Sequence, residues 1–278
     1  MELIKLAARR SKWSDIVYIL LNIAYAMSLF ILVSPGVELP YLAYLLVFLS
    51  KWRVIAVRPR FWFANLQANF VDFLVGISVV TLMLITATTT PWVGILLAIL
   101  FSFWLLVLKP HGAQHLILVQ AGVAQFAALT ALFSLAHSFE LKPFITDSSF
   151  PTVVIAWLIG YMSARHALSS FKKEEDRALL SLVWGFVVAE LAWLAHHWTI
   201  AYSIYQGAVP ADKQLMIPQV AIVMTLLGFV VIRWYEVFDA AENKKKLTKD
   251  ARSATIFALI ALAILLVFFN GSLDITAL

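Results

Sequence analysis

Glu190 and the pair His196 and His197 stand in one apolar run, VVAELAWLAHHWTIAY, residues 187–202. A carboxylate at bilayer depth costs on the order of 3 kcal/mol, so Glu190 is expected to face a bundle interior, to find a partner or to stay protonated. At 3.6 residues per turn, Glu190, Trp193 and His197 share one helix face, and His196 points about 100° away. Glu190 and His197 are separated by roughly 10 Å of rise, which excludes a direct hydrogen bond.

Two interpretations of Glu190 remain open. In the first, Glu190 and His197 belong with Gln125 and Gln120 to a polar path for protons or substrate, in which His197 titrates near neutral pH and burial keeps Glu190 protonated until something binds. In the second, a protonated Glu190 ties its helix to Gln125, and His197 lies at the outer interface. The first interpretation expects a water-accessible cavity that reaches Glu190.

The other histidines suggest metal or haem chemistry only weakly. His111 and His115 have the spacing at which two imidazoles can share a metal, but no carboxylate or thiolate accompanies them, and the chain has no cysteine. A bis-histidine haem would need a pair such as His137 with His197, or His115 with His166, yet all of these lie near the ends of apolar runs. We therefore expect no metal and no cofactor.

The composition is that of a membrane protein. Of the 278 residues, 62% are hydrophobic and 13% charged, with a mean hydropathy of +0.89, whereas soluble domains are about half apolar and a quarter charged. A spanning helix needs roughly 20 mostly apolar residues. Nine such runs predict an all-α, polytopic transmembrane bundle: residues 15–33, 39–57, 70–89, 92–108, 114–137, 151–168, 178–202, 215–235 and 254–270.

The basic residues predict the orientation. With nine spans and the N-terminus inside, every lysine and arginine except Lys142 and Lys213 falls on the inside, as the positive-inside rule requires, and the C-terminus lies outside. The second run, 39–57, is interrupted by Lys51 and Arg53, which are expected to snorkel toward the headgroups. Without this span, the basic residues that follow it would lie on the wrong face.

The same pattern predicts the location and the partners. We expect a multi-pass protein of the cytoplasmic membrane that contacts anionic headgroups and no nucleic acid, because the basic residues border the membrane at every inside loop. A membrane-protein partner or homo-oligomer remains open. The predicted headgroup contacts are Arg53, Arg58, Arg60, Lys172 and Lys173.

The chain divides into an amphipathic interfacial segment, residues 1–14, and a single transmembrane domain, residues 15–278. Within the fifth run, alanines recur at three and four residues and predict a smooth stripe for close helix packing. This stripe consists of Ala121, Ala124, Ala128 and Ala131.

The stretch KWRVIAVRPRFWFANLQANFVDF, residues 51–73, places Pro59 in a first helical turn and aromatic residues at the interface. It resembles uncharacterised polytopic membrane proteins of Saccharibacteria and related candidate phyla. That resemblance implies no activity.

The nine-span layout is also similar to that of UbiA-type prenyltransferases, whose two aspartate-rich motifs bind magnesium and diphosphate. Asn65, Asn69 and Asp72 fall roughly where that family has its first motif. The sequence departs from the pattern, because a single aspartate stands there and the second place holds Glu174, Glu175 and Asp176 after two lysines.

Three hypotheses follow. The favoured one is a permease-like protein with a polar path around Glu190. The alternative is a membrane-embedded enzyme acting on a lipid-linked, prenyl diphosphate-like substrate near Asn69 and Asp72, which expects Asp72 to converge with Glu174 or Asp176. The third is a structural subunit of a membrane complex. Motifs of soluble catalysts, such as GxSxG, HExxH or a glycine-rich phosphate loop, are absent from the sequence.

Overall fold

The computed structural model describes residues 12–110, 112–138, 149–171, 176–197, 201–203, 216–240 and 244–268. These residues are almost entirely helical. The elements are α2 (Lys12–Val33), α3 (Pro40–Leu49), α4 (Trp52–Ile55), the 3-10 turn η1 (Pro59–Phe61), α5 (Trp62–Thr86), α6 (Pro91–Phe103), the π-helical turn η2 (Trp104–Leu108), α7 (Gln114–Ser138), α8 (Ser149–Leu168), α9 (Arg177–His197), β1 (Ala201–Ser203), β2 (Met216–Pro218), α10 (Gln219–Asp239) and α11 (Lys244–Phe268).

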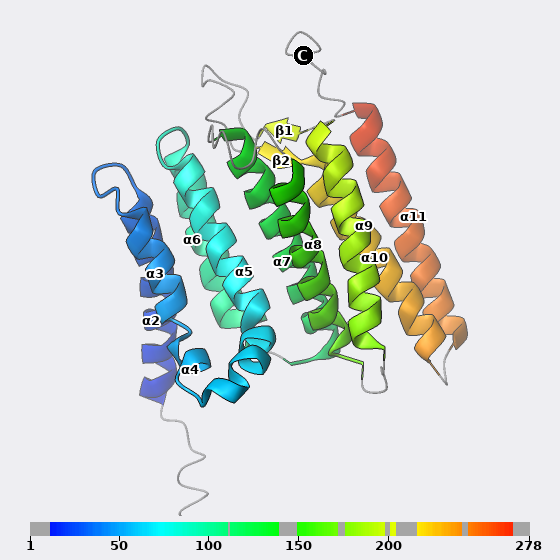
Figure 1. The fold of residues 1–278 in the computed structure, drawn as a ribbon, viewed down its shortest axis with the longest axis horizontal. Coiled ribbons are helices and arrows are strands. Elements are labelled where there is room, and N and C mark those ends of the chain that lie inside the picture. The colour runs from blue at the N-terminus through cyan, green and yellow to red at the C-terminus, as the bar shows by residue number, and fades with distance from the viewer. Residues whose placement is uncertain are drawn as a thin grey trace, which may run out of the picture.

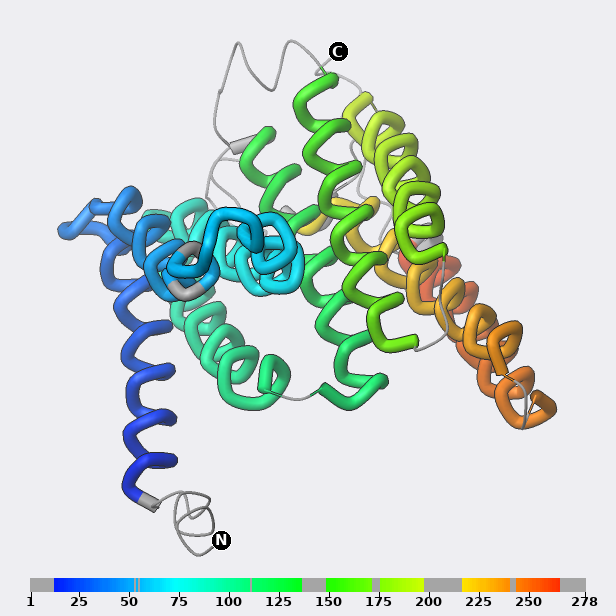
Figure 2. Tube along the Cα trace, turned by 60° about the horizontal axis from the view of Figure 1, so that its bottom comes forward, coloured from blue at the N-terminus to red at the C-terminus, as the bar shows by residue number. Residues whose placement is uncertain are grey.

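The long helices stand side by side, and successive ones run in opposite directions (Figure 1). We call the end of the bundle that carries Arg58, Lys109, Arg177 and Lys244 the basic end; α2, α5, α7, α9 and α11 begin there. Helices α5, α7 and α9 end at the opposite end, where α6, α8 and α10 begin. Figure 2, turned by 60°, shows α2 and α11 at opposite margins of the molecule.

The structure confirms an all-α bundle of the membrane-spanning type. Six helical segments among the described residues are long and apolar enough to cross a bilayer: Trp13–Val33, Pro59–Thr86, Pro91–Leu108, Gln114–Ala136, Arg177–His197 and Gln219–Asp239. Large apolar side chains cover the outward faces of the helices, for example Leu20, Leu100, Val183 and Phe257. Exposed apolar surface of this extent suits lipid and not water.

Two short stretches differ from the predicted helices. The helix predicted for 178–202 ends at His197, and Ala201–Ser203 instead forms strand β1, which pairs antiparallel with β2, Tyr202 opposite Ile217. The sequence did not predict these strands because a short apolar run carries no periodicity that distinguishes a strand from a helix. Before α5, the helical segment begins with Pro59 in η1, as predicted, because the fixed φ of proline suits a first helical turn.

The second predicted span is broken. Helix α3 ends at Leu49, only ten residues after it begins, and a turn at Ser50 and Lys51 leads into α4. Ten helical residues rise about 15 Å, half the thickness of the hydrocarbon core. The prediction that Lys51 snorkels to the headgroups is wrong, because its ammonium is drawn inward to Asp72; the side chain of Arg53 lies outside the described part of the chain.

Small residues hold the two halves of the bundle together. One apolar core lies among α2, α3, α5 and α6, and a second lies among α7, α8, α9 and α10. The alanine stripe of α7 is buried along its whole length, so the predicted packing surface is confirmed. Helix α11 packs against α10 at the margin of the bundle.

Candidate functional site

A cavity with polar side chains in its wall forms where α3 breaks off against α5. These two helices approach closely because Gly76 has no side chain: a Cβ placed there would lie 2.9 Å from Cγ1 of Val47. Two residues after Val47 the helix ends at Leu49, and the next residue, Ser50, donates its hydroxyl hydrogen to the carbonyl oxygen of Val47 at 2.7 Å. The close approach and the helix end together direct Lys51 toward α5.

A second irregularity brings another lysine to the same place. After Phe103 the α6 backbone widens into the π-helical turn η2, in which the amide of Lys109 donates to the carbonyl oxygen of Trp104 at 2.9 Å. Isolated π turns of this kind occur often at functional sites. The widened turn buries Trp104 and Leu105, and Lys109 follows directly after it.

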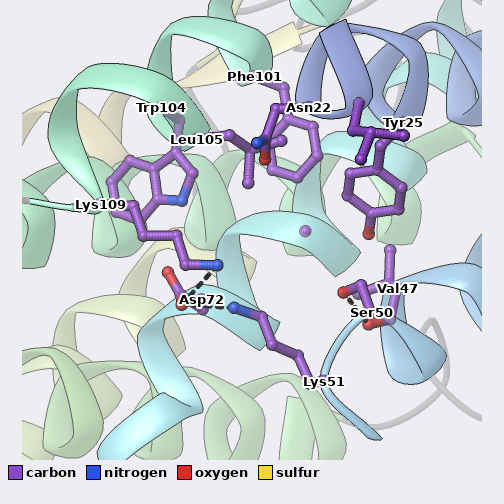
Figure 3. A pocket seen from close by; sticks show the side chains of 12 residues that line it. Asn22, Tyr25, Val47, Ser50, Lys51, Asp72, Phe101, Trp104, Leu105 and Lys109 are labelled. Carbon is purple, nitrogen blue, oxygen red and sulfur yellow. Dashed lines mark hydrogen bonds and ion pairs between the residues drawn. The ribbon is translucent and has the colours of Figure 1, made fainter. Parts of the chain in front are cut away.

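Both lysines bind one carboxylate. Nζ of Lys51 lies 2.5 Å from Oδ2 of Asp72, and Nζ of Lys109 lies 3.3 Å from the same oxygen (Figure 3). The side chains of Lys51 and Asp72 are only 11% and 17% exposed, whereas that of Lys109 is 34% exposed. The cluster therefore holds one largely buried ion pair and a second, partly exposed cation, with one positive charge in excess.

This cluster forms one wall of a cavity of about 190 Å³ enclosed by α2, α3, α5 and α6 with η2. Asn22, Tyr25 and Ser50 add polar groups, and Figure 3 shows the hydroxyl of Tyr25 directed toward Ser50. Apolar side chains, among them Phe101, complete the lining; the rings of Tyr25 and Phe101 are 5.9 Å apart at their centroids. Apolar walls with a few convergent polar groups are typical of small-molecule sites.

A hydrogen-bonded layer continues from this cluster into α7 and α8. Gln120, predicted to line a polar path, donates from Nε2 to the carbonyl oxygen of Leu108 at 2.6 Å, and its Oε1 is 2.9 Å from Nε2 of His166. Arg165, the neighbour of His166, lies beside Gln67 of α5, whose amide oxygen accepts from it in the favourable amide orientation. Gln120 therefore joins α7 to η2 and α8.

Gln125 is also buried and also bonded, but at another place. Its Nε2 donates to the carbonyl oxygen of Met224 at 3.1 Å, and its Oε1 accepts from the indole nitrogen of Trp184 at 2.8 Å. These bonds join α7 to α9 and α10. The interpretation in which Gln125 is the partner of Glu190 is not met, because its side-chain groups are taken up by Trp184 and Met224.

Glu190 lies on the outside of the bundle. Its side chain is exposed and lines a groove between α8 and α9, so the expectation that it faces the interior is wrong. The physical reason is that small residues, Gly160 of α8 and Gly185 with Val188 of α9, occupy the contact face between these helices and turn Glu190 away from it. His197 is exposed near the end of α9, with its ring 4.9 Å from that of Trp193, as their shared face predicted.

The four residues of the predicted path thus do not converge. Gln120 and Gln125 bond to different partners in the interior, while Glu190 and His197 lie on the surface of α9. Their role in a proton or substrate path stays a prediction. The cavity of the lysine cluster contains none of the four, whereas Glu190 alone among them lines the groove between α8 and α9.

The residues considered for metal or haem are dispersed. His115 is exposed, His166 is bonded to Gln120, and His111 and the side chain of His137 lie outside the described residues. Within the described ranges, no group of three or more His, Asp or Glu side chains could hold a metal ion. Asn69 donates to the carbonyl oxygen of Asn65 at 2.9 Å, one turn earlier in α5.

Of the predicted headgroup residues, Arg58 and Arg60 are exposed at the basic end, and the guanidinium of Arg60 lies 4.6 Å from the centroid of the Phe61 ring. Lys172 and Lys173 fall outside the described residues. Lipid contacts of these side chains stay a prediction.

Lys51 and Lys109 were missed as site residues, although one signal for them was present. Lys51 interrupts an apolar run, and a charge in such a position needs a partner. Asp72, near the start of the following run, is a carboxylate of opposite charge on a neighbouring helix. Pairing the two from sequence would have indicated the cluster; Lys109, at the very end of its run, gave no such signal.

Comparison of the chain with family models, with curated proteins and with solved structures finds no match. The class is defined by the molecule itself: a membrane-type helical bundle with a charged cavity between its N-terminal helices.

Proposed function

We propose that this chain is a permease-like protein of the cytoplasmic membrane that carries a small anionic solute through the cavity of Lys51, Asp72 and Lys109. The observation that carries the proposal is this buried cluster on the wall of a 190 Å³ cavity, at a break in an apolar helix. Ionisable groups within the membrane are costly and mark substrate pathways by default.

The backbone around the cavity supports a transport role. Irregular backbone at membrane depth is tolerated where it lines a cavity, and interrupted helices form the binding sites of many transporters. Two irregular segments meet here, the turn at Ser50 and Lys51 and the π turn η2. Neither would be needed to pack two apolar helices against each other.

The charge and size of the cavity indicate the solute. Two ammonium groups against one carboxylate leave an excess positive charge, which favours a monovalent anion. A volume of 190 Å³ is below the range of roughly 300 to 1,000 Å³ of drug-sized sites, so the solute has only a few non-hydrogen atoms. Small carboxylates and inorganic anions meet both conditions.

The proposed topology has nine crossings with the basic end in the cytoplasm, the second crossing being made by α3, the turn and α4. Its support is the alternating direction of the helices and the positions of the basic residues at one end (Figure 1). In this orientation Arg58 and Arg60 face anionic headgroups, and the cavity lies toward the cytoplasmic side.

The enzyme alternative has weaker support. Magnesium-dependent diphosphate chemistry needs free carboxylates, and the oxygen Oδ2 of Asp72 is bound by two ammonium groups. Glu174 lies outside the described residues, and Asp176 is exposed.

Transport can be tested with the purified full-length chain in proteoliposomes. Flux of acetate, lactate, nitrate and phosphate is measured for the natural chain and for Lys51→Met. We expect flux of at least one anion, reduced tenfold or more by Lys51→Met. Lys245→Met, at an exposed lysine on α11, is the matched control and should transport normally. Absence of flux for all four anions would favour a structural subunit.

A further inference from the structure

A groove of about 640 Å³ runs between α8 and α9 on the outside of the bundle, far along the chain from the lysine cavity. Figure 1 shows these two helices side by side. The groove is lined by Val154 and Trp157 of α8 and by Phe186, Glu190, Trp193 and Leu194 of α9, among others. Phe186 and Trp193 are 56% and 50% exposed, so the groove opens outward, where the proposed membrane would place lipid.

Glu190 is the one ionisable residue in this lining, and nothing described satisfies it. It forms no hydrogen bond or ion pair with any residue that the structure describes. Trp157, its neighbour in the groove, has a buried indole N–H without an acceptor, so this donor does not serve Glu190 either. Glu190 lies about 20 Å of rise from the start of α9 and about 10 Å from His197, at hydrocarbon depth.

Aromatic rings surround this carboxylate. Trp157 and Phe186 face each other across the groove with ring centroids 6.3 Å apart, and the ring of Trp157 stacks on Tyr161 at 5.6 Å. Trp193 follows Glu190 by one turn of the same helix. Aromatic faces attract organic cations, most strongly where water is excluded, and a nearby carboxylate adds charge complementarity.

We infer that the groove of Trp157, Phe186, Glu190 and Trp193 binds a hydrophobic organic cation that enters from the lipid. The volume fits a ligand of drug size, the walls are apolar and aromatic, and the single acid supplies the counter-charge. This site is separate from the lysine cavity and opposite to it in charge preference.

A second copy of the chain fits the groove less well. A partner helix would have to bring a cation to the depth of Glu190, about 10 Å from the outer end of α9. The lysines and arginines of the described helices instead lie toward the basic end, for example Arg165 near the end of α8 and Arg177 at the start of α9. A hydrophobic cation that partitions into lipid reaches Glu190 without this constraint.

The test is binding of tetraphenylphosphonium to the detergent-purified full chain, measured by equilibrium dialysis, with neutral triphenylphosphine oxide as the comparison ligand. We expect saturable binding of the cation, and an affinity at least tenfold lower for Glu190→Gln. Glu38→Gln, at an exposed glutamate in the loop before α3, is the matched control and should bind normally. The neutral ligand should not distinguish the natural chain from Glu190→Gln.

Trp193→Leu provides a second variant, which keeps the carboxylate and removes one ring; a three- to tenfold loss of cation affinity is expected. Lys51→Met should bind the cation like the natural chain, since it alters the other cavity. Failure of the natural chain to bind, or equal binding by Glu190→Gln, would overturn the inference. So would a change of oligomeric state in Glu190→Gln without any cation binding, which would identify the groove as a protein interface.

Discussion

Lys51 and Asp72 approach to 2.5 Å between Nζ and Oδ2, across the junction of α3 and α5, although 21 residues separate them in the chain. Lys109 reaches the same oxygen from η2 at 3.3 Å. One carboxylate thus holds three helical segments together at the point where a predicted span breaks. The cluster therefore both connects these three segments and forms the candidate solute site.

Removal of the shared acid should destabilise the fold. Asp72→Asn leaves Lys51 buried beside a second ammonium without a counter-ion, and we expect the free energy of unfolding to fall by about 3 kcal/mol. Thermal unfolding in detergent measures the change. Adding Lys51→Met to Asp72→Asn should restore part of the stability; a double variant less stable than Asp72→Asn would show that Lys51 does not depend on the acid for its burial.

Solute binding should depend on the positive charge of Lys51, because its ammonium is one of the two cations beside Asp72 in the cavity. Lys51→Arg keeps a positive charge and should retain anion binding, whereas Lys51→Met should weaken it about tenfold or more.

Equilibrium binding of the transported anion to the natural chain and to the two variants measures the difference. Binding by Lys51→Met that is as strong as in the natural chain would separate the site from the charge of Lys51.

Close packing of α8 on α9 should tolerate no added methyl group at Gly160. A Cβ there would lie 2.5 Å from Cγ2 of Val188, so Gly160→Ala should cost about 1 to 3 kcal/mol. Gly122→Ala in α7 is the matched control, since its Cβ meets nothing closer than 4.0 Å, and it should be neutral or stabilising by up to about 1 kcal/mol. The apparent melting temperature in detergent should therefore fall for Gly160→Ala and stay the same or rise for Gly122→Ala; an equal fall in both variants would show that the contact with Val188 is not the cause.

Gln125 should matter for stability through Trp184. Gln125→Leu removes the acceptor of the indole N–H and one bond to α10, at an expected cost of about 1 to 3 kcal/mol. Combining it with Trp184→Phe, which removes the donor as well, should cost less than the sum of the single changes. Thermal unfolding of the single and double variants gives this coupling; strict additivity would mean that the two side chains act independently.

Much of the fold follows from periodicity and hydropathy. Each predicted run contains a helix, and the alanine stripe of α7 is buried as its spacing indicates, because a spanning helix needs length and apolarity and these are local properties. The break after Leu49 is not local. It depends on Asp72, in the next long helix, and on the missing Cβ of Gly76, which only the folded chain brings to Val47.

The residues of the predicted polar path do not converge, for a related reason. Helical spacing correctly puts Trp193 and His197 on one face with Glu190, but it does not say whether that face meets a neighbouring helix or the surroundings. Gly160 and Gly185 determine which side of α9 packs against α8, and this places the face of Glu190 on the outside. Gln120 and Gln125 are buried between helices, and their hydrogen-bond partners come from four different elements.

The proposed transport role is tested most directly at Ser50, which lines the cavity beside Lys51. Because the chain has no cysteine, Ser50→Cys creates a single thiol whose reaction with a membrane-impermeant, charged thiol reagent can be followed from each side of oriented vesicles. Ala128→Cys, in the sealed core of α7, is the unreactive control. We expect labelling of Ser50→Cys from both sides and slower labelling when a transported anion is present. Labelling from neither side, or from one side only and unaffected by any anion, would contradict the role of this cavity in transport.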